Sequence, residues 1–419
     1  MDRFAITDAI LLLGDKLSCK TGLSLIISSG KVAGITDGDL PSDLDRISLP
    51  HHLLVPRFVN AHTHIDDSII KDVGLGMDAW DLVMPPAGMR HKAMEASSRE
   101  AIREAMRETM EFMMMSGTGA FADFRSQGRT GCEDLRKAAE GLPIKPVIFG
   151  RLTIPSGYSE RDFVETGKGL TPEQRQELDE LLEVAEGFSL VSALDFTDGA
   201  LAEIRSVVRD RGKLLALHAA EHPRYREISI RRTGVSDVTR ILRHLEPDFV
   251  VHLTDANEAE LDAIADASLP VVLCHRMHSI CGYGVPPLLS LLQRQSSVSL
   301  GTDNVFLTSP NMLSEGAYVS RLWRGITSDA GAISHDEILA MMTLNGASAL
   351  KLSDGIGSLA VGKDASFIVF DLATKNLSGT KDPKAALINR AETSDIAAVV
   401  ARGIEVVGRI GNSQRTPIV

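Results

Sequence analysis

Residues 53–64 read LLVPRFVNAHTH, an apolar run that ends in two histidines separated by one residue. Side chains at positions i and i+2 of a strand point to the same side, so the imidazoles of His62 and His64 can converge on one point. A divalent metal ion is the usual reason for such a pair. From this short motif alone, two surface histidines in a turn are the alternative.

The bulk composition narrows the class of protein. The chain has 419 residues, 44% of them hydrophobic, which is enough for a large core. A net charge of −12 disfavours a nucleic-acid-binding surface, which needs a basic patch. The four cysteines have no CxxC spacing, which fits a reducing compartment. Without a signal peptide or an 18-residue apolar stretch, we expect a cytoplasmic protein that binds no membrane.

Short apolar runs recur through the middle of the chain, most of them separated by helix-like stretches. Eight strands that alternate with helices over roughly 300 residues fit a (β/α)8 TIM barrel. A doubly wound sheet is the alternative, but no GxGxxG or P-loop motif supports it. The runs are residues 53–60, 119–124, 146–152, 190–196, 214–218, 249–253, 271–274 and 298–300.

The sequence pattern at both ends of the chain differs from that of the middle and predicts short strands and turns. Neither end is long enough for a stable sheet by itself, so we expect them to combine. The predicted fold class is α/β. A metal-binding (β/α)8 barrel would span residues 56–351, and a small β-sandwich domain would be built from residues 1–55 and 352–419.

Residues suited to metal chemistry follow the C-terminal ends of four runs. His62 and His64 end the first run, His218 the fifth and His252 the sixth, and Asp303 follows the eighth. In a barrel these ends form one face, which carries the chemistry. Each residue alone has an ordinary explanation, such as a structural histidine or an aspartate in a turn or helix cap. Those explanations would have to coincide at four strand ends.

Glu221 lies three residues after His218 and is the candidate proton carrier. Imidazole and carboxylate ligands suit zinc or iron(II). Such a metal lowers the pKa of bound water from about 15.7 to about 7, and an acid must then deliver the proton to the leaving group. The alternative for Glu221 is an ordinary acidic residue in the first turn of a helix.

The order HxH, HxxE, H and GTDN, flanked by split β segments, resembles the amidohydrolase superfamily. It resembles most closely the cytosine-deaminase and chlorohydrolase-like branch. Residues 56–64 are close to that family's PGFVNAHTH opening, although Arg57 stands where the family usually has glycine. Residues 282–288 resemble its GxGxPPL segment, and residues 344–347 and 357–365 resemble its TxNGAxALG and GSIxxGKxADLIVFD segments.

The resemblance implies a role for each of these residues. One divalent metal ion, zinc in the first place and iron(II) as the alternative, would be held by His62, His64, His218 and Asp303. Glu221 would move protons between the water and the substrate ring nitrogen. His252 would hydrogen-bond the water or the tetrahedral intermediate, and Asp303 would also accept a proton from the water. The fourth run lacks the lysine of binuclear branches, which favours one metal.

Loops at the same face should set the specificity. Residues 66–88 form a candidate lid, in which Trp80 could stack on a flat heterocycle or pack the loop onto the barrel. Residues 274–278 read Cys-His-Arg-Met-His where the family often has Cys-Pro-x-Ser-Asn, which indicates either an altered substrate contact or a rearranged surface loop. The candidate substrate contacts are Trp80, Arg125, Arg151, Asp195, His275 and His278.

The resemblance implies a hydrolytic deaminase of an amino-substituted heterocycle: a nucleobase, nucleoside, pterin or triazine-like ring. Hydroxide would attack the amidine carbon and ammonia would leave. The alternative is a cyclic amide or imide hydrolase, or a heteroaromatic chlorohydrolase, that uses the same site. A non-enzymatic barrel is disfavoured by Glu221 and His252, because a structural site needs no proton carrier. The expected partners are the substrate, water and further copies of the chain.

Overall fold

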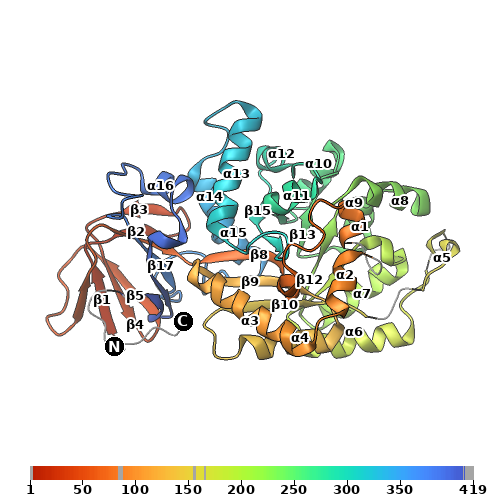
Figure 1. Cartoon of the computed structure of the whole chain (residues 1–419), viewed down its shortest axis with the longest axis horizontal. Helices are drawn as coiled ribbons and strands as arrows, with labels where there is room; N and C mark the ends of the chain where they lie inside the picture. The colour runs from red at the N-terminus through yellow and green to blue at the C-terminus, as the bar shows by residue number, and fades with distance from the viewer. Residues whose placement is uncertain (1–2, 84–87, 154–156, 165–166, 409, 411–419) are drawn as a thin grey trace.

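The computed structural model describes residues 3–83, 88–153, 157–164, 167–408 and 410. Two parts lie side by side along the long axis in Figure 1. One part is rich in strands and contains segments from both the beginning and the end of the chain. The other is larger and has helices wrapped around a parallel sheet.

The sheet of the larger part is parallel throughout and closes on itself. Its order is β15-β14-β13-β12-β11-β10-β9-β8-β16. The short strand β16 follows β15 closely in the chain, so β15 and β16 together count as the eighth strand of the barrel. Closure comes from the parallel pairing of β16 with β8, where Asp303 lies opposite Thr63. The predicted TIM-type barrel is confirmed. Its strands are β8 (Phe58–His64), β9 (Thr118–Arg125), β10 (Lys145–Gly150), β11 (Gly187–Leu190), β12 (Leu214–Ala219), β13 (Phe249–His252), β14 (Val271–Leu273), β15 (Val298–Leu300) and β16 (Asp303–Asn304).

Helices connect the strands and cover the outside of the barrel (Figure 1). Short helices also occupy the loops at the carboxyl ends of the strands. The helices of the loops and connections are η1 (Ile65–Ile70), α1 (Ala79–Val83), α2 (Met89–Glu95), α3 (Arg99–Met115), α4 (Gly128–Ala139), α5 (Glu160–Val164), α6 (Pro172–Val184), η2 (Ala193–Asp195), α7 (Asp198–Asp210), α8 (Pro223–Thr233), α9 (Asp237–Arg240), η3 (Ile241–Leu245), α10 (Glu258–Asp266), α11 (His275–Cys281), α12 (Leu288–Gln293), α13 (Met312–Thr327), α14 (His335–Met342), α15 (Leu344–Ala349), α16 (Pro383–Asn389) and η4 (Thr393–Asp395).

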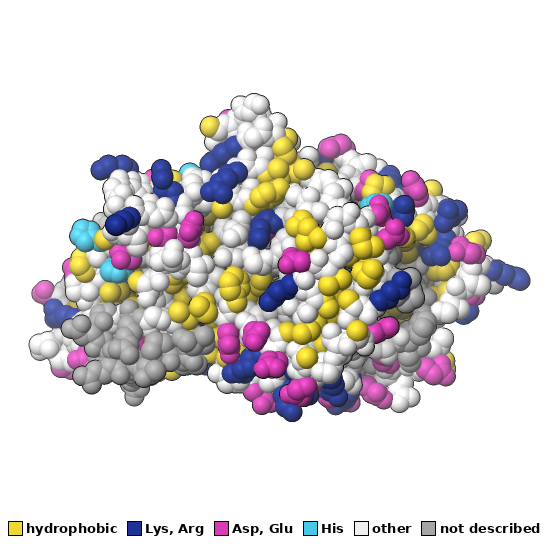
Figure 2. Space-filling view, in the orientation of Figure 1, with side chains coloured by type: hydrophobic (Ala, Val, Ile, Leu, Met, Phe, Trp, Pro, Cys, Tyr) yellow, Lys and Arg dark blue, Asp and Glu magenta, His cyan; other side chains and the backbone are white. Residues whose placement is uncertain are grey.

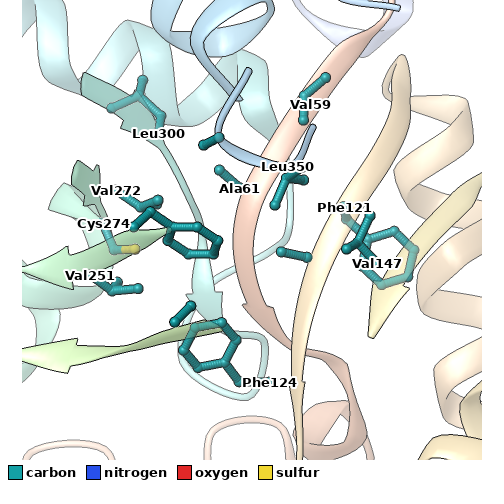
Figure 3. Close-up of a cluster of buried hydrophobic side chains, with 14 of the residues drawn as sticks. Val59, Ala61, Phe121, Phe124, Val147, Val251, Val272, Cys274, Leu300 and Leu350 are labelled. Carbon is teal, nitrogen blue, oxygen red and sulfur yellow. The ribbon is translucent and has the colours of Figure 1, made fainter. Parts of the chain in front are cut away.

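The barrel strands read as continuous apolar runs because both of their faces are buried. Val59, Phe121 and Val251, from three different strands, are each fully buried. Figure 3 shows these side chains in one cluster, together with Leu300 and Leu350. This packing fixes the strands relative to one another and therefore fixes the positions of their ends.

The strand-rich part consists of two sheets. One has four strands in the order β5-β4-β1-β6, and the other has six in the order β19-β18-β17-β7-β2-β3. Strands from both ends of the chain pair directly, since β7 lies antiparallel to β17. The strands are β1 (Arg3–Thr7), β2 (Ile10–Leu13), β3 (Ser18–Lys20), β4 (Ser24–Ser28), β5 (Lys31–Thr36), β6 (Asp45–Ser48), β7 (His52–Pro56), β17 (Phe367–Asp371), β18 (Ile396–Ala401) and β19 (Ile404–Gly408).

The six-stranded sheet separates two hydrophobic cores. Along β7 and β17, successive side chains point to opposite faces, as in any strand. Leu54 and Phe367 belong to the core that the sheet shares with the four-stranded sheet. Val55 and Ile368 belong to the core of the barrel. The six-stranded sheet thus joins the strand-rich part to the barrel.

Two of the predicted strands were wrong in their extent. The run at 53–60 is not one strand, because β7 ends at Pro56 and β8 begins at Phe58. Between them the buried Arg57 donates to the carbonyl oxygens of Pro143 and Thr118. The fourth barrel strand is β11 and ends at Leu190, so the run at 190–196 was placed too late. The chain leaves the extended conformation there because the Ser192 hydroxyl accepts a hydrogen bond from Leu194 N and starts η2.

On the face in Figure 2, acidic and basic side chains lie interspersed along the helices, with apolar side chains scattered between them. Within the described ranges, no helix is both long enough and apolar enough to cross a membrane.

Barrel closure gives a first testable prediction, at Gly301. A Cβ atom at this position would lie 2.8 Å from Cβ and 2.9 Å from the backbone N of His62 in β8. Gly301→Ala should therefore lower the free energy of unfolding by about 1–3 kcal/mol, the usual cost of overpacking. Denaturant titration followed by circular dichroism measures the change. The control is Gly325→Ala in α13, where a Cβ meets nothing within 4 Å and an unchanged or slightly raised stability is expected. Equal stability of the two variants would contradict the tight closure.

Candidate functional site

The ends of β8, β13 and β16 bring three histidines around the carboxylate of Asp303. Oδ1 of Asp303 lies 3.4 Å from Nε2 of His62 and 3.5 Å from Nε2 of His64. Oδ2 of the same carboxylate lies 3.7 Å from Nε2 of His252. All four side chains are nearly or fully buried. The structure therefore gathers these predicted residues at one point.

His218, at the end of β12, joins the same group. Its ring centroid lies 5.1 Å from that of His62 and 5.5 Å from that of His64. Ligand atoms of His62, His218 and His252 all lie within 4.8 Å of one another, as do those of His62, His64 and Asp303. Four imidazoles and one carboxylate thus surround a single small volume.

Hydrogen bonds behind two of these rings fix which nitrogen faces the centre. Nδ1 of His64 lies 3.0 Å from the carbonyl oxygen of Phe124, and Nδ1 of His218 lies 3.1 Å from that of Val191. A carbonyl oxygen can only accept, so Nδ1 of His218 carries the proton, whereas Nδ1 of His64 also lies 2.9 Å from the Arg151 guanidinium, which can only donate. Nε2 of His218 is then unprotonated and presents its lone pair to the centre, which is how metal-binding histidines are oriented.

Several buried polar atoms at the centre have no hydrogen-bond partner. Among the described residues they include both ring nitrogens of His62, Nε2 of His252 and Oδ2 of Asp303. Leaving a buried polar group unsatisfied costs about 1–3 kcal/mol. Unsatisfied nitrogen and oxygen atoms that face one another are explained if a cation binds between them. Imidazole and carboxylate ligands fit zinc well.

Glu221 lies beside this centre, just beyond the end of β12. Its Oε1 lies 3.9 Å from Nε2 of His252. Burial, with a further contribution from the nearby carboxylate of Asp303, raises the pKa of Glu221 to about 8. A carboxyl group with such a pKa can carry a proton near neutral pH.

The centre opens into a cavity at the carboxyl ends of the strands, where barrel enzymes carry their active sites. The cavity combines predicted residues with others that had not been predicted. It is lined by His64, Val83, Arg90, His91, Arg151, Val191, His218, Glu221, Tyr225, Asp303 and Asn304.

The backbone is strained where two of the site residues leave their strands. His252 has φ 86° and Asp303 has φ 60°, both in the left-handed region, and neither is glycine. Such conformations cost of order 1–3 kcal/mol and cluster at functional sites. Here they turn the two side chains toward the centre as the strands end.

Arg125 and Arg151 end neighbouring strands but have different surroundings. Arg125 is buried and forms ion pairs with Asp66 and Asp123, and it does not line the cavity. Arg151 lines the cavity, and its Nη2 lies 2.9 Å from Nδ1 of His64. Within the described part of the chain, no carboxylate pairs with Arg151, and its Nε has no hydrogen-bond partner. Of the two predicted substrate contacts, only Arg151 is placed for that role.

Trp80 and Asp195 do not line the cavity themselves. The ring of Trp80 packs 5.5 Å from that of Tyr225 and 5.8 Å from that of His222. This arrangement favours the alternative in which Trp80 packs its loop onto the barrel. Asp195 lies in η2, beyond the end of β11, and is exposed.

His275 and His278 are both fully buried and do not line the cavity either. Nε2 of His275 accepts a hydrogen bond from the indole of Trp323, 3.1 Å away. Nε2 of His278 lies 2.7 Å from Nδ1 of His252. The segment after β14 is therefore the helix α11 packed behind the centre, which removes the alternative of a rearranged surface loop.

The candidate lid brings further charged residues to the site. Arg90 lines the cavity and forms ion pairs with Asp66 at 2.9 Å and Asp67 at 3.2 Å. Two adjacent acids, Asp66 and Asp67, which follow His64 after one residue, were the only sequence signal for this network. Nothing in the sequence indicated Arg90 or Tyr225. Residues 84–87 of the candidate lid lie outside the described residues.

The chain matches the model of the Amidohydrolase family over residues 53–406. This chain belongs to the amidohydrolase family. A protein of Methanothermobacter thermautotrophicus named as an aminohydrolase is 31% identical over 96% of this chain and 99% of its own length. The 5-methylthioadenosine/S-adenosylhomocysteine deaminase of Teredinibacter turnerae is 25% identical over 82% of this chain and 77% of its own length.

Solved structures agree with the barrel fold of this amidohydrolase. A zinc-bound adenosine deaminase from Xanthomonas campestris superposes with a TM-score of 0.81 at 19% identity, covering 99% of this chain and 94% of the other. A zinc complex of atrazine chlorohydrolase from Arthrobacter aurescens superposes with a TM-score of 0.83 at 16% identity, covering 99% and 97%. The predicted branch of the superfamily is confirmed, as is the predicted class of enzyme, a hydrolase of carbon–nitrogen bonds other than peptide bonds.

The surroundings of Arg125 give a second prediction. Arg125→Met leaves Asp66 and Asp123 buried without this partner, so it should lower the free energy of unfolding by about 3–5 kcal/mol. Denaturant titration measures the loss. The control is Arg129→Met, which removes exposed ion pairs and should change stability by at most about 1 kcal/mol. If Arg125→Met were as stable as the parent and instead raised KM, Arg125 would be a substrate contact after all.

Proposed function

We propose that this amidohydrolase is a metal-dependent hydrolytic deaminase of an amino-substituted heterocycle. One zinc ion, with iron(II) as the alternative, would be held by His62, His64, His218 and Asp303. The observation that carries the proposal is the group of unsatisfied nitrogen and oxygen atoms that face one another at the strand ends. Glu221 lines the same cavity, so a proton carrier stands next to the proposed ligands.

The names of the relatives favour a purine ring within this substrate class. Relatives are named deaminases of 5-methylthioadenosine and S-adenosylhomocysteine, and of 5'-deoxyadenosine. Structural neighbours include an adenosine deaminase and a guanine deaminase with bound guanine. All of these substrates are purines, so a purine nucleobase or nucleoside ranks before a pterin or a triazine.

The chain's own residues divide the proton transfers of such a reaction. When bound, the metal supplies Lewis-acid chemistry that makes water a nucleophile near neutral pH. Asp303 accepts a proton from the attacking water through Oδ2, the oxygen that has no hydrogen-bond partner. Glu221 gives its proton to the ring nitrogen beside the amidine carbon. The proton held by Asp303 then passes to the amino group, which leaves as ammonia, and Glu221 takes back a proton from the hydroxyl oxygen as the carbonyl forms, so both side chains return to their starting states.

Two further residues orient the reactants. His252 directs Nε2 at the space between Asp303 and Glu221 and hydrogen-bonds the oxygen that attacks. Arg151 anchors an anionic or polar substituent of the substrate, since it lines the cavity without a carboxylate partner among the described residues. Both roles use contacts that a substrate can complete in the cavity.

The second candidate is hydrolysis of a heteroaromatic chloride or of a cyclic amide at the same site. A chlorohydrolase among the structural neighbours favours the former. The same ligands and the same proton carrier would serve, but chloride rather than ammonia would leave.

We also propose that residues 1–55 and 352–419 form one β-sandwich domain beside a barrel of residues 56–351. The core shared by the four-stranded and six-stranded sheets supports this division. Residues 411–419, at the end of the second segment, lie outside the described residues. The cytoplasmic location and the assembly of several copies stay predictions from the sequence.

A heterocycle panel tests the reaction. Protein of measured zinc content is incubated with nucleobases, nucleosides, pterins and triazines, chlorinated triazines included, and released ammonia and chloride are measured. We expect ammonia from an aminopurine. Chelation should abolish turnover and leave the circular dichroism spectrum unchanged, and added zinc should restore turnover. Turnover without ammonia would contradict deamination, and unchanged turnover after complete metal removal would contradict the metal-dependent mechanism.

Glu221→Gln tests the proton carrier. The amide keeps the shape of the side chain but cannot donate and accept a proton in turn, so kcat should fall by about 10²- to 10⁴-fold. The zinc content should stay near that of the parent, because Glu221 is not a proposed ligand. Glu227→Gln, at an exposed position on α8, is the matched control and should keep full activity. A fully active Glu221→Gln enzyme would refute the mechanism.

A further inference from the structure

We propose that His278 is a positioning residue, which donates a hydrogen bond to Nδ1 of His252 and thereby keeps the proton of His252 on Nε2. Nε2 is the nitrogen that faces the proposed metal centre. The inference rests on the function proposed above and assigns a role to the segment in which this chain departs from its family pattern. His278 does not line the cavity, so its effect on the reaction passes through His252.

Three side chains form a hydrogen-bonded row behind the centre. Nε2 of His278 lies 2.7 Å from Nδ1 of His252, and Nδ1 of His278 lies 2.8 Å from Oγ1 of Thr254. The two ring centroids are 4.6 Å apart. Both imidazoles have no exposed surface. The row is therefore closed to water along its side and ends at the single free nitrogen of His252.

The row can carry its protons in only two ways. Both rings are fully buried, and among the described residues no carboxylate forms an ion pair with His278 or with Nδ1 of His252, so both are neutral. A neutral imidazole has one N–H donor and one acceptor nitrogen. If His252 donates to His278, its Nε2 is a bare acceptor at the centre. If His278 donates to His252, the Nε2 of His252 carries the proton and the hydroxyl of Thr254 donates to Nδ1 of His278.

The groups at the centre select the second arrangement. Nε2 of His252 faces Oδ2 of Asp303 at 3.7 Å and Oε1 of Glu221 at 3.9 Å. A bare nitrogen there would direct its lone pair at the Asp303 carboxylate, whereas an N–H is attracted to that carboxylate. The same N–H can donate to an oxygen that enters between Asp303 and Glu221. His278 thus makes His252 a hydrogen-bond donor at the point of attack.

The surrounding structure holds His278 in place. Oε1 of Glu315, in α13, accepts hydrogen bonds from the backbone N–H groups of His275 at 2.8 Å and Arg276 at 3.3 Å at the start of α11. Trp323, also in α13, donates to His275. These contacts attach α11 to a longer helix. His278, one turn further along, then points at the back of His252.

The first experiment reads the proton on His252 directly. Long-range ¹H–¹⁵N correlation spectra of zinc-loaded protein labelled with ¹⁵N-histidine distinguish the tautomers, and His252→Gln identifies the signals of His252. We expect a protonated Nε2 in the parent. In His278→Phe, which keeps a ring but has no donor, we expect a shift to the Nδ1-protonated form or to a mixture. A bare Nε2 in the parent, or an unchanged tautomer in the variant, would overturn the proposal.

The second experiment measures turnover with a substrate identified by ammonia release. His278→Phe should lower kcat by about 10- to 100-fold, the usual effect of losing a partner behind a site histidine, with KM and zinc content little changed. His278→Gln, which keeps an N–H donor, should recover part of the loss. Ser279→Ala, on the same helix but bonded to Tyr318, is the control and should match the parent. An unchanged kcat in His278→Phe, or a loss confined to KM, would refute the positioning role.

Thr254 provides a test that does not depend on the folding of His278→Phe. Thr254→Val removes the hydroxyl at nearly constant volume and should loosen the tautomer preference of His252, whereas Thr254→Ser should preserve it. An unchanged tautomer preference in Thr254→Val would contradict the proposed arrangement, in which Thr254 donates to His278 and His278 donates to His252. Because the spectra need no turnover, they decide the role of His278 even if the panel finds no deaminase activity, so the two proposals can fail separately.

Discussion

The pairing of β16 with β8 is the interaction on which both the fold and the site depend. It closes the barrel, with Asp303 opposite Thr63 and Asn304 opposite His64, and Thr302 donates its backbone N–H to the carbonyl oxygen of His62. The same contact brings the Asp303 carboxylate against the two histidines of β8. A shift of one residue in this register would turn Asp303 away from them, because successive side chains of a strand point to opposite sides. The same strand pairing therefore closes the barrel and places Asp303 in the proposed metal site.

The sequence was sufficient to predict the barrel and the set of histidines for a physical reason. In a parallel barrel the C-terminal ends of all strands lie on one face, so residues predicted at those ends are also predicted to lie close together in space. The environments of these residues could not be predicted in the same way. Arg125 and Arg151 each end an apolar run, and only the fold shows that Asp66 and Asp123 surround the first and not the second. The end of β11 was misplaced because a hydrogen bond that the Ser192 hydroxyl accepts from the backbone N–H of Leu194, and not a change in hydrophobicity, ends the extended stretch.

Most of the charged side chains in the loop after β8 and at the end of β9 pair with one another. Arg90 shares Asp66 with Arg125 and has Asp67 as a second partner. Asp67 also accepts hydrogen bonds from the backbone of the loop after β16, through the N–H groups of Val305 and Phe306. This network stiffens the mouth of the barrel and neutralises its own arginines. Arg151 lines the cavity and has no carboxylate partner among the described residues. An electron-rich or anionic group of the substrate would supply that partner.

The segment at 274–278 shows that a change next to the active site can affect the catalytic groups without affecting which substrate binds. A departure from a family pattern next to an active site can indicate an altered substrate contact, which was one of the two interpretations that the sequence allowed, beside a rearranged surface loop. Burial decides otherwise, because His275 binds Trp323 and His278 binds His252, and neither reaches the cavity. A change at these positions can then alter the proton arrangement of the catalytic groups without touching the substrate. Selection among heterocycles then falls to the side chains that line the cavity, such as Arg151 and Tyr225, and Trp80 packs against Tyr225.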